Sequence, residues 1–354
     1  MASTLKDVAL RAGVSVRTVS NVVNNYVYVA EETRTRVQAA IDELGYRPNL
    51  LARNLKLGRS GIIGLVVPEL DVPYFAELAR LVVQEARAAG YTVLIDQTDG
   101  DERRELELVT EDPRGVSFDG MIVSPLSLTA EQFEARRTTA PVLLLGERLF
   151  TTAGADHVAI DNVAAAREAT AHLISLGRTR IAAVGVQEGG GTATLRTRGY
   201  REAFAQAGLP VDESLMIPTR FYHRADGATA MARLLDLPEP PDAVFAFSDL
   251  LALGALRVAL HRGLAVPRDV AIVGFDDIED GRYSTPTLTT IAPDKAEIAR
   301  AAVRQIVARI DGGGSGGGGA AGSGGETEAG AESKEIQAPY RLVVRESTLG
   351  VTAS

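Results

Sequence analysis

The sequence predicts an α/β fold: an N-terminal three-helix domain with a helix-turn-helix unit, followed by a larger body with two parallel α/β lobes. Three observations lead to this prediction. Helical patterns separated by a glycine turn fill the first 45 residues. From Gly61 onward, short apolar runs alternate with amphipathic helical segments, as in parallel sheets covered by helices on both faces. That part of the chain is about 280 residues long, which favours two lobes over one.

In the N-terminal part, residues that cap or stop helices separate three helical patterns. The helices are expected at residues 5–12, 16–24 and 31–44. Thr4 can cap the first helix, with Asp7 completing a capping box, and Ser15 can cap the second. Gly13 supplies the turn between them, because glycine adopts left-handed backbone conformations readily.

In the body, the apolar runs and amphipathic segments give the order of elements. Strands are expected at residues 62–67, 91–95, 121–123, 142–145, 181–184, 243–247, 270–275 and 340–344, and the long helices at 74–89, 163–176, 195–207, 249–262 and 294–310. The glycine-rich segment at about 312–335 cannot bury enough apolar surface to offset its ordering entropy, so we expect a disordered surface loop.

Charge is distributed unevenly between the two parts. Residues 1–60 carry nine basic and five acidic side chains, a net charge of +4, whereas the remainder carries 28 basic and 41 acidic ones, a net charge of −13. A basic head on an acidic body favours a nucleic-acid contact confined to the head, although chance could produce the same asymmetry.

Several classes of protein are disfavoured. The chain has no cysteine, and its four histidines, at 157, 172, 223 and 261, lack the spacing of metal ligands, so we expect no disulfide, metal or cofactor. The glycine run at 189–191 could cradle a phosphate, but a flexible loop is the favoured interpretation. No nucleophile motif or long apolar span is present, so we expect a cytoplasmic protein that is neither an enzyme nor a membrane protein.

The second helix is the candidate DNA-reading element. In a helix-turn-helix unit this helix lies in the major groove and its N-terminal residues meet base edges. The outward candidates are Val16, Arg17 and Asn21; Arg17 can donate two hydrogen bonds to guanine and Val16 can contact a thymine methyl. Small polar side chains that could position the domain on phosphates are Thr4, Ser15, Thr18 and Asn24. A purely structural three-helix unit is the alternative.

The head resembles that of the LacI/GalR family of bacterial repressors. The residues that carry the resemblance are 5–24, Thr33, Arg34, Val37 and 44–49. The resemblance implies three segments: a DNA-binding domain at 1–46, a hinge helix and linker at 47–60, and a ligand-binding and dimerisation domain at 61–354. Ala30 departs from the Ser or Thr that family members usually have as the cap of the third helix.

The resemblance also implies that the hinge folds on the operator and enters the minor groove at the centre of a palindrome. Asn49, Ala52, Leu55 and Lys56 would contact DNA there, and Leu55 matches an apolar wedge that unstacks a base step. Leu55 as a core residue of a linker helix is the alternative.

The body resembles the periplasmic-binding-protein-like (type I) core of the same family. Matching landmarks include 118–120, 161–162, 172–177, 196–200, 273–277, 286–290 and 345–348. The resemblance implies one lobe at about 61–160 plus 287–312 and another at about 161–286 plus 335–354. Effector-binding candidates in the cleft between them are Tyr74, Phe75, Ser124, Glu147, Arg196, Tyr222, Ser248 and Asp276. Structural roles remain the alternatives: a core Phe75, a turn at Asp276 and a surface ion pair for Arg196.

Together these expectations describe a homodimeric repressor that binds palindromic operator DNA and responds to a small-molecule effector. A sugar is the leading effector, and a nucleoside or another metabolite is the alternative. A sugar-binding transport protein is a further alternative, which the basic head disfavours. The operator, the regulated genes and the direction of the response are left open by the sequence.

Overall fold

The computed structural model describes residues 3–23, 26, 28–46, 59–110, 117–126, 128–136, 140–146, 155–187, 191–313 and 333–350. The chain divides into two compact units, Met1–Gly61 and Ile62–Ser354, which we call the head and the body. Most of the expected hinge and of the glycine-rich segment lies outside the described residues. Within the described part, no helix is both long and apolar enough to span a membrane.

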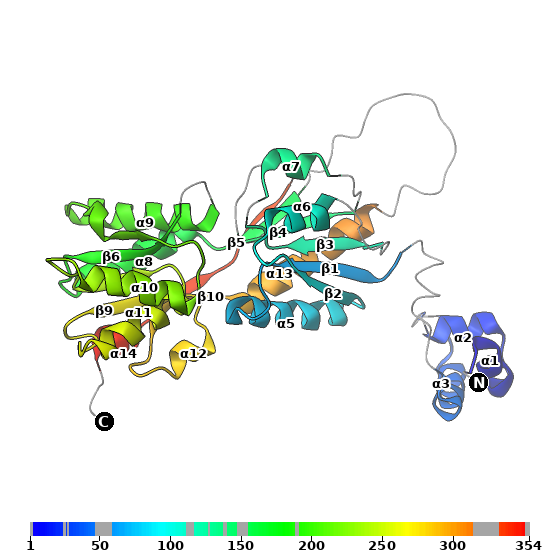
Figure 1. The fold of residues 1–354 in the computed structure, drawn as a ribbon. Coiled ribbons are helices and arrows are strands. Elements are labelled where there is room, and N and C mark those ends of the chain that lie inside the picture. The colour runs from blue at the N-terminus through cyan, green and yellow to red at the C-terminus, as the bar shows by residue number, and fades with distance from the viewer. Residues whose placement is uncertain are drawn as a thin grey trace. The chain divides into compact units, whose positions relative to one another are not determined.

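The head consists of α1 (Leu5–Ala12), α2 (Val16–Val23) and α3 (Glu31–Leu44), as Figure 1 shows. Each helix contributes a fully buried valine to a common core: Val8, Val19 and Val37. The three predicted helices are therefore confirmed; the second is described as far as Val23, and Asn24 lies outside the described residues.

The predicted helix caps are also present. Asp7 N–H donates to Thr4 Oγ1 at 3.4 Å, and Thr4 N–H donates to Asp7 Oδ2 at 2.8 Å, which completes the capping box. Thr18 N–H donates to Ser15 Oγ at 3.1 Å. Gly13 has φ 62°, the left-handed conformation expected at the turn. Ala30 provides no side-chain cap for α3.

The described strands of the body form two sheets of six. The first has the order β11-β5-β4-β3-β1-β2, with β1 (Ile62–Val67), β2 (Thr92–Gln97), β3 (Gly120–Val123), β4 (Val142–Leu145), β5 (Ala155–Ala159) and β11 (Glu335–Gln337). The second has the order β12-β10-β9-β8-β6-β7, with β6 (Ile181–Val186), β7 (Met216–Pro218), β8 (Ala243–Ala246), β9 (Ala271–Phe275), β10 (Thr289–Pro293) and β12 (Tyr340–Val343). Among these strands, β10 and β12 pair antiparallel and the other pairs are parallel.

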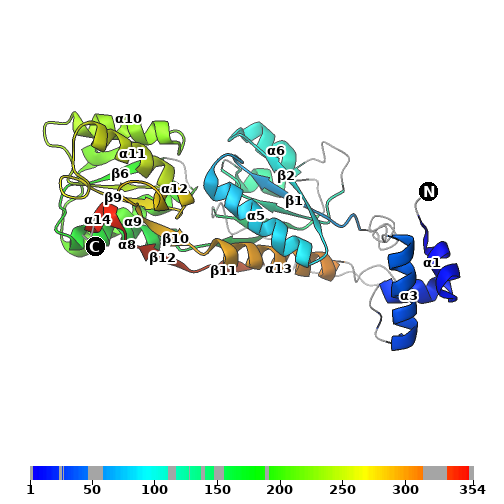
Figure 2. The same cartoon turned by 90° about the horizontal axis from the view of Figure 1, so that it is seen from below.

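Helices cover both faces of each sheet (Figure 2). On the first sheet, α5 (Pro73–Ala88) and α13 (Lys295–Gly313) lie on one face and α6 (Glu102–Thr110) and α7 (Ala130–Glu134) on the other. On the second, α8 (Asn162–Ser175) and α9 (Gly191–Ala207) lie opposite α10 (Arg224–Leu235) and α11 (Asp249–His261). The shorter helices are η1 (Glu213–Leu215), α12 (Glu279–Arg282) and α14 (Glu346–Leu349).

Burial on both faces explains the nearly continuous apolar strands. Successive side chains of a strand point to opposite faces. In β1, Leu65 packs with α5 and α13, whereas Val66 packs with the cluster that contains Phe133 of α7. Both faces therefore demand apolar residues.

The chain passes between the two lobes after β5, after β10 and between β11 and β12. This corrects two expected lobe boundaries. The segment 287–312 was expected in the first lobe, but β10 pairs with β9 in the second sheet, so the crossing follows Pro293. The segment 335–354 was expected in the second lobe, but β11 pairs with β5 in the first sheet. The short strands β10 and β11, like β5 and β7, lack a strong apolar pattern in the sequence.

Close packing of α10 on α11 depends on two glycines. A Cβ atom added at Gly254 would lie 2.0 Å from the carbonyl oxygen of Arg224, and one added at Gly227 would lie 2.1 Å from that of Leu251. Neither carbonyl can move away as a flexible side chain could, because both belong to helical backbone.

We expect Gly254→Ala to lower the free energy of unfolding by about 1–3 kcal/mol, because the methyl group would force the two helices apart. Urea denaturation followed by circular dichroism measures this change. Arg257→Ala, at an exposed position of the same helix, is the matched control and should cost less than about 0.5 kcal/mol. Equal midpoints for the two variants would contradict the packing argument.

Candidate DNA-reading helix and strand-end cluster

The amino-terminal end of α2 presents side chains that the core of the head does not use. Val16 is 42% exposed and Arg17 is exposed, whereas Val19 is completely buried. Among the described residues, Arg17 makes no hydrogen bond or ion pair. Its guanidinium is therefore available to donate two hydrogen bonds to a planar acceptor such as a guanine edge. Asn21 lies one turn further along and is half-buried.

The polar residues predicted to meet phosphates already stabilise helix starts. Ser15 Oγ accepts the Thr18 N–H and lies 2.9 Å from Thr18 Oγ1. Thr4 Oγ1 donates to Asp7 Oδ2 at 2.7 Å. The other predicted DNA contacts fall outside the described residues: Asn24, Asn49, Ala52, Leu55 and Lys56.

In the body, polar and aromatic side chains meet where strands of the second sheet end. We call the group formed by Tyr74, Arg196, Phe275, Asp276 and Lys295 the strand-end cluster. It draws on α5 and α13, which pack on the first sheet, and on α9 and β9 of the second lobe. The carboxyl ends of parallel strands are the usual place for ligands in open α/β sheets.

Arg196 is held in a fixed position. Its side chain comes from α9, and the residue is only 8% exposed. Nε donates to Asn162 Oδ1 at 3.1 Å, Nη1 donates to the carbonyl oxygen of Phe247, and the guanidinium lies 3.5 Å from the centre of the Phe275 ring. A side-chain amide, a main-chain carbonyl and an aromatic ring thus orient the guanidinium of Arg196. The surface ion pair considered as the alternative from the sequence is not formed by this buried side chain.

Asp276 directly follows β9 and carries the acidic charge of the cluster. Burial raises the pKa of its carboxyl group to about 6, and the nearby charges of Arg196 and Lys295 limit the rise. Burial also raises the pKa of the Tyr74 hydroxyl, and the Asp276 charge raises it further. Lys295 Nζ lies 5.9 Å from the centre of the Tyr74 ring and donates to the Asp276 carbonyl, and Arg196 packs on Phe275, which precedes Asp276. The structure therefore brings together three predicted residues from both lobes: Tyr74, Arg196 and Asp276.

The remaining effector candidates divide into neighbours of the cluster and residues with other roles. Phe75 makes an edge-to-face contact with Tyr74, with ring centres 5.3 Å apart. Ser248 follows the Phe247 carbonyl that Arg196 binds, and its hydroxyl caps α11 by accepting the Leu251 N–H at 3.2 Å.

Tyr222 donates its hydroxyl to the Gly185 carbonyl in β6 at 2.6 Å. Ser124 follows β3, where its N–H bonds the Val66 carbonyl at 2.9 Å, and the described residues show no hydrogen bond from it to the cluster. Glu147 lies outside the described residues.

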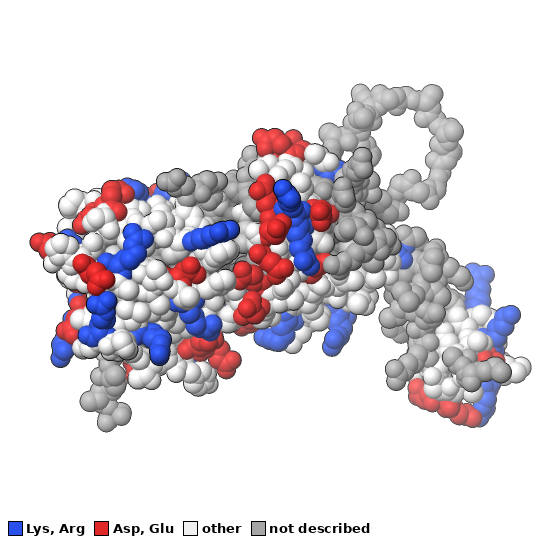
Figure 3. All heavy atoms as spheres, viewed as in Figure 1, with Lys and Arg blue, Asp and Glu red and all other residues white. Residues whose placement is uncertain are grey.

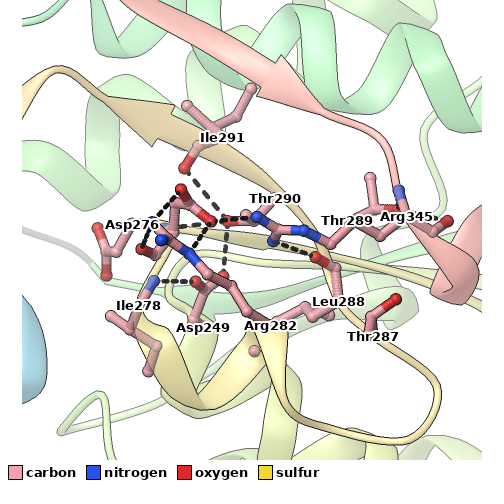
Figure 4. A network of polar contacts seen from close by, with 12 residues as sticks. Asp249, Asp276, Ile278, Arg282, Thr287, Leu288, Thr289, Thr290, Ile291 and Arg345 are labelled. Atoms are coloured by element: carbon pink, nitrogen blue, oxygen red, sulfur yellow. Dashed lines mark hydrogen bonds and ion pairs between the residues drawn. The ribbon is translucent and has the colours of Figure 1, made fainter.

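Figure 4 shows the polar network that holds Asp276 in place. Asp276 and Asp277 have φ values of 113° and 48°, a region that L residues rarely adopt. The buried Asp249 carboxyl group accepts from Ile278 N–H at 2.9 Å and from Thr290 Oγ1 at 2.6 Å. Burial and the nearby Asp276 charge raise the pKa of Asp249. Ionisation of this carboxyl group is therefore unfavourable at this position.

Two arginines hold the second residue of this turn. Arg345 Nη2 donates to Asp277 Oδ1 at 2.6 Å, and Arg282 Nη2 donates to Asp277 Oδ2 at 2.7 Å. Burial would raise the pKa of Asp277, but these two charge-assisted hydrogen bonds lower it overall. Asp277 is therefore part of the turn's support, in line with the turn interpretation considered for this pair.

Sequence reasoning missed Lys295, Phe275 and Asn162 as members or neighbours of this cluster. Phe275 and Asn162 fit ordinary strand and helix-start patterns, so no local signal distinguishes them. Lys295 had a signal: a lysine at the first residue of a helix is unfavourable next to the positive end of the helix dipole, and it therefore indicates a specific partner.

A cavity of about 390 Å³ lies elsewhere in the body, at the amino-terminal ends of β8 and β9. It is lined by Leu235, Pro240, Pro241, Asp242, Arg262, Leu264 and Asp269. Its carboxylates are already engaged, since Asp242 accepts the N–H groups of Thr179 and Arg180 and Asp269 accepts that of Ala265. The strand-end cluster is therefore the better candidate site for a polar ligand.

Comparison with known proteins identifies both parts of the chain. Residues 4–49 match the model of the bacterial regulatory proteins of the lacI family, and residues 170–348 match that of a periplasmic binding protein-like domain. The repressor CytR of Escherichia coli K12 is 35% identical over 314 residues, which cover 88% of this chain and 91% of CytR.

Two solved structures match along almost the whole chain. A CelR–cellobiose complex is 32% identical with a TM-score of 0.70, and the lac repressor dimer bound to operator is 25% identical with a TM-score of 0.75. Each match covers 98% of this chain and 99% of the other chain.

A helix-turn-helix head followed by a two-lobed α/β body, with these relatives, defines a DNA-binding transcriptional regulator. The chain belongs to the lacI family of bacterial regulatory proteins. The predicted fold class and the resemblance stated from the sequence are both confirmed.

The raised pKa of Asp276 gives a prediction about stability and pH. A carboxyl group with a pKa of about 6 in the folded body binds its proton more tightly than in the unfolded chain. Its stabilising contribution is complete at low pH and is lost as the pH rises through about 6. Asp276→Asn, which mimics the protonated form, should therefore melt at a higher temperature than the parent chain at pH 7, and the difference should shrink towards pH 4.

Differential scanning calorimetry at both pH values measures this effect. Asp71→Asn, at an exposed position, is the control and should leave the melting temperature nearly unchanged throughout. A lower melting temperature for Asp276→Asn at pH 7 would show that the ionised carboxylate stabilises the fold.

Proposed function

We propose that this regulator represses transcription by binding a palindromic operator as a homodimer, and that a sugar bound at the strand-end cluster controls the binding. The observation that carries the DNA-binding part is the exposed, unpaired Arg17 at the start of α2. The lac repressor, which matches 98% of this chain, was solved as a dimer bound to operator. Two-fold symmetry of a dimer suits a palindromic site.

On DNA, the side chains of the head divide by task. Arg17, Val16 and Asn21 would read base edges in the major groove. Ser15, Thr18 and Thr4 would meet phosphates and fix the register. The hinge residues Asn49, Ala52, Leu55 and Lys56, with Asn24, would complete the contact, and Leu55 would enter the minor groove as a wedge.

The strand-end cluster supports a neutral, hydroxyl-rich effector. Arg196 is a buried donor and Asp276 a half-buried acceptor, so together they can bracket neighbouring hydroxyl groups. The aromatic pair Tyr74 and Phe75 can pack on the apolar face of a sugar ring. CelR, a relative by structure, was solved with cellobiose.

A nucleoside is the second candidate effector. The same aromatic pair offers ring faces on which a base could stack. Tyr222, Ser248, Ser124 and Glu147 remain proposed as further contacts in either case.

The effector would act by shifting an equilibrium. A ligand that spans the two lobes favours the conformation in which both lobes contact it, and it can shift the hinge only by its difference in affinity for the two states. We further propose that the protein acts in the cytoplasm and has no enzymatic activity, since the relatives reported above are regulators or regulator complexes.

Replacing Arg17 tests the DNA-reading assignment. In a selection from random duplexes, the parent chain should enrich a palindrome, and Arg17→Ala should lose preference at one base pair of each half-site, at a cost of about 1–3 kcal/mol. Arg36→Ala, at an exposed position of α3, is a control for the loss of one positive charge. Identical selected sequences for Arg17→Ala and the parent chain would show that Arg17 does not read bases.

A thermal-shift series tests the effector assignment. Cellobiose, D-ribose and cytidine are the probes, and a true effector should raise the melting temperature of the body in proportion to the logarithm of its concentration. Arg196→Met should abolish the shift, whereas Arg198→Met, at an exposed position of the same helix, should retain it. A shift with cytidine alone would favour the nucleoside, and a shift that survives Arg196→Met would place the ligand elsewhere.

A further inference from the structure

Lys295 has one buried ammonium group with three acceptors. The residue is 6% exposed. Nζ donates to the carbonyl oxygens of Asp276 at 2.8 Å and Asp277 at 3.1 Å, and it pairs with Glu77 Oε2 at 2.6 Å. An ammonium group has three N–H donors, so these partners satisfy it completely.

The three acceptors belong to different lobes. Asp276 and Asp277 follow β9 in the second sheet, whereas Glu77 lies on α5, which packs on the first sheet. Lys295 itself is the first residue of α13, at the point where the chain leaves β10 of the second lobe for a helix of the first. One side chain at a crossover segment therefore ties the turn of one lobe to a helix of the other.

The position of Lys295 at the start of α13 indicates that its contacts are specific. A cation at the start of a helix opposes the helix dipole, and removing an ammonium from water is costly unless it is paired. The Glu77 carboxylate and two carbonyls offset both costs. The ammonium group in turn holds the main-chain carbonyls of Asp276 and Asp277, whose left-handed conformations need support.

The helix on the other side of this link packs directly on the strand that begins the body. Leu78 and Val82 of α5 share a core with Ile63 and Leu65 of β1. Because that core is fully buried and closely packed, a displacement of α5 is passed to β1 rather than absorbed. The link from the Asp276 turn thus reaches the first strand of the body through Glu77 and α5.

We propose that Lys295 is a positioning residue that couples the Asp276–Asp277 turn to α5. A displacement of the turn at the strand-end cluster is then passed to the first lobe through the Lys295–Glu77 ion pair. This inference deepens the proposed function, because it assigns a route by which a ligand at Asp276 acts on the first lobe. The coupling itself is a property of the free protein and can be measured without any effector.

Hydrogen–deuterium exchange of the intact protein tests the coupling. The turn contains protected amides, since Asp276 N–H bonds the Ile291 carbonyl at 2.8 Å and Ile278 N–H bonds Asp249. Glu77→Gln changes only the first-lobe partner and keeps its shape. We expect faster exchange at residues 276–278 in this variant, and in Lys295→Met faster exchange both there and in the first turns of α5.

Two further variants separate coupling from a local structural role. Lys295→Arg restores the charge and should recover most of the protection at the turn. Arg300→Met removes an exposed cation of the same helix, which pairs with Glu297, and should leave the turn unchanged. If Lys295→Met does not fold, Glu77→Gln decides the question alone.

Unchanged exchange at residues 276–278 in Glu77→Gln would overturn the coupling. Binding of a nonspecific 40-base-pair duplex, measured in parallel, should equal that of the parent chain in Glu77→Gln. If the parent chain did not bind the duplex, the proposed function would be contradicted. Unchanged exchange in Glu77→Gln with normal duplex binding would overturn only the coupling, so the two outcomes are distinguishable.

Discussion

The partial burial of the Asp276 charge is the constraint on which the arrangement around the strand-end cluster depends. An ionised carboxyl group taken out of water needs cations and hydrogen-bond donors nearby. Arg196 of α9 and Lys295 of α13 supply the cations, and each is itself buried and fixed by other partners. The segments that supply these charges are far apart in sequence, so the charge balance at this point exists only in the complete fold.

The C-terminal segment stabilises the Asp276 turn by hydrogen bonds to β9, to Thr289 and to Asp277. Ser347 Oγ donates to the Ile272 carbonyl in β9 at 2.6 Å and accepts the N–H of Thr289 at 2.8 Å. Arg345 then reaches Asp277 from the same segment. Since β11 lies in the first sheet and β12 in the second, the last residues are covalently part of both lobes. Acidic and basic side chains are interspersed over the face of the body drawn in Figure 3.

How much the sequence could predict depends on whether the cause is local. Thr4, Gly13 and Ser15 act within one turn of their own helices, and the predicted caps and turn are confirmed. Arg196 and Asp276 could be chosen only through family resemblance, because their contacts join residues far apart in sequence. The lobe boundaries at β10 and β11 were wrong because short strands take their sheet from tertiary pairing and not from a pattern of their own.

The predicted phosphate contacts of the head are not equivalent once their hydrogen bonds are known. The Thr4 hydroxyl accepts from Asp7 N–H and donates to Asp7 Oδ2, so both its roles are filled. The Thr4 hydrogen bonds lower the pKa of Asp7, which keeps a negative charge beside any approaching phosphate. Ser15 and Thr18 instead share one hydrogen bond between two hydroxyls, which leaves one hydroxyl proton for a phosphate oxygen while the cap stays intact. DNA can therefore be met by the start of α2 without dismantling the helix, whereas an approach at Thr4 would have to break the capping box that begins α1.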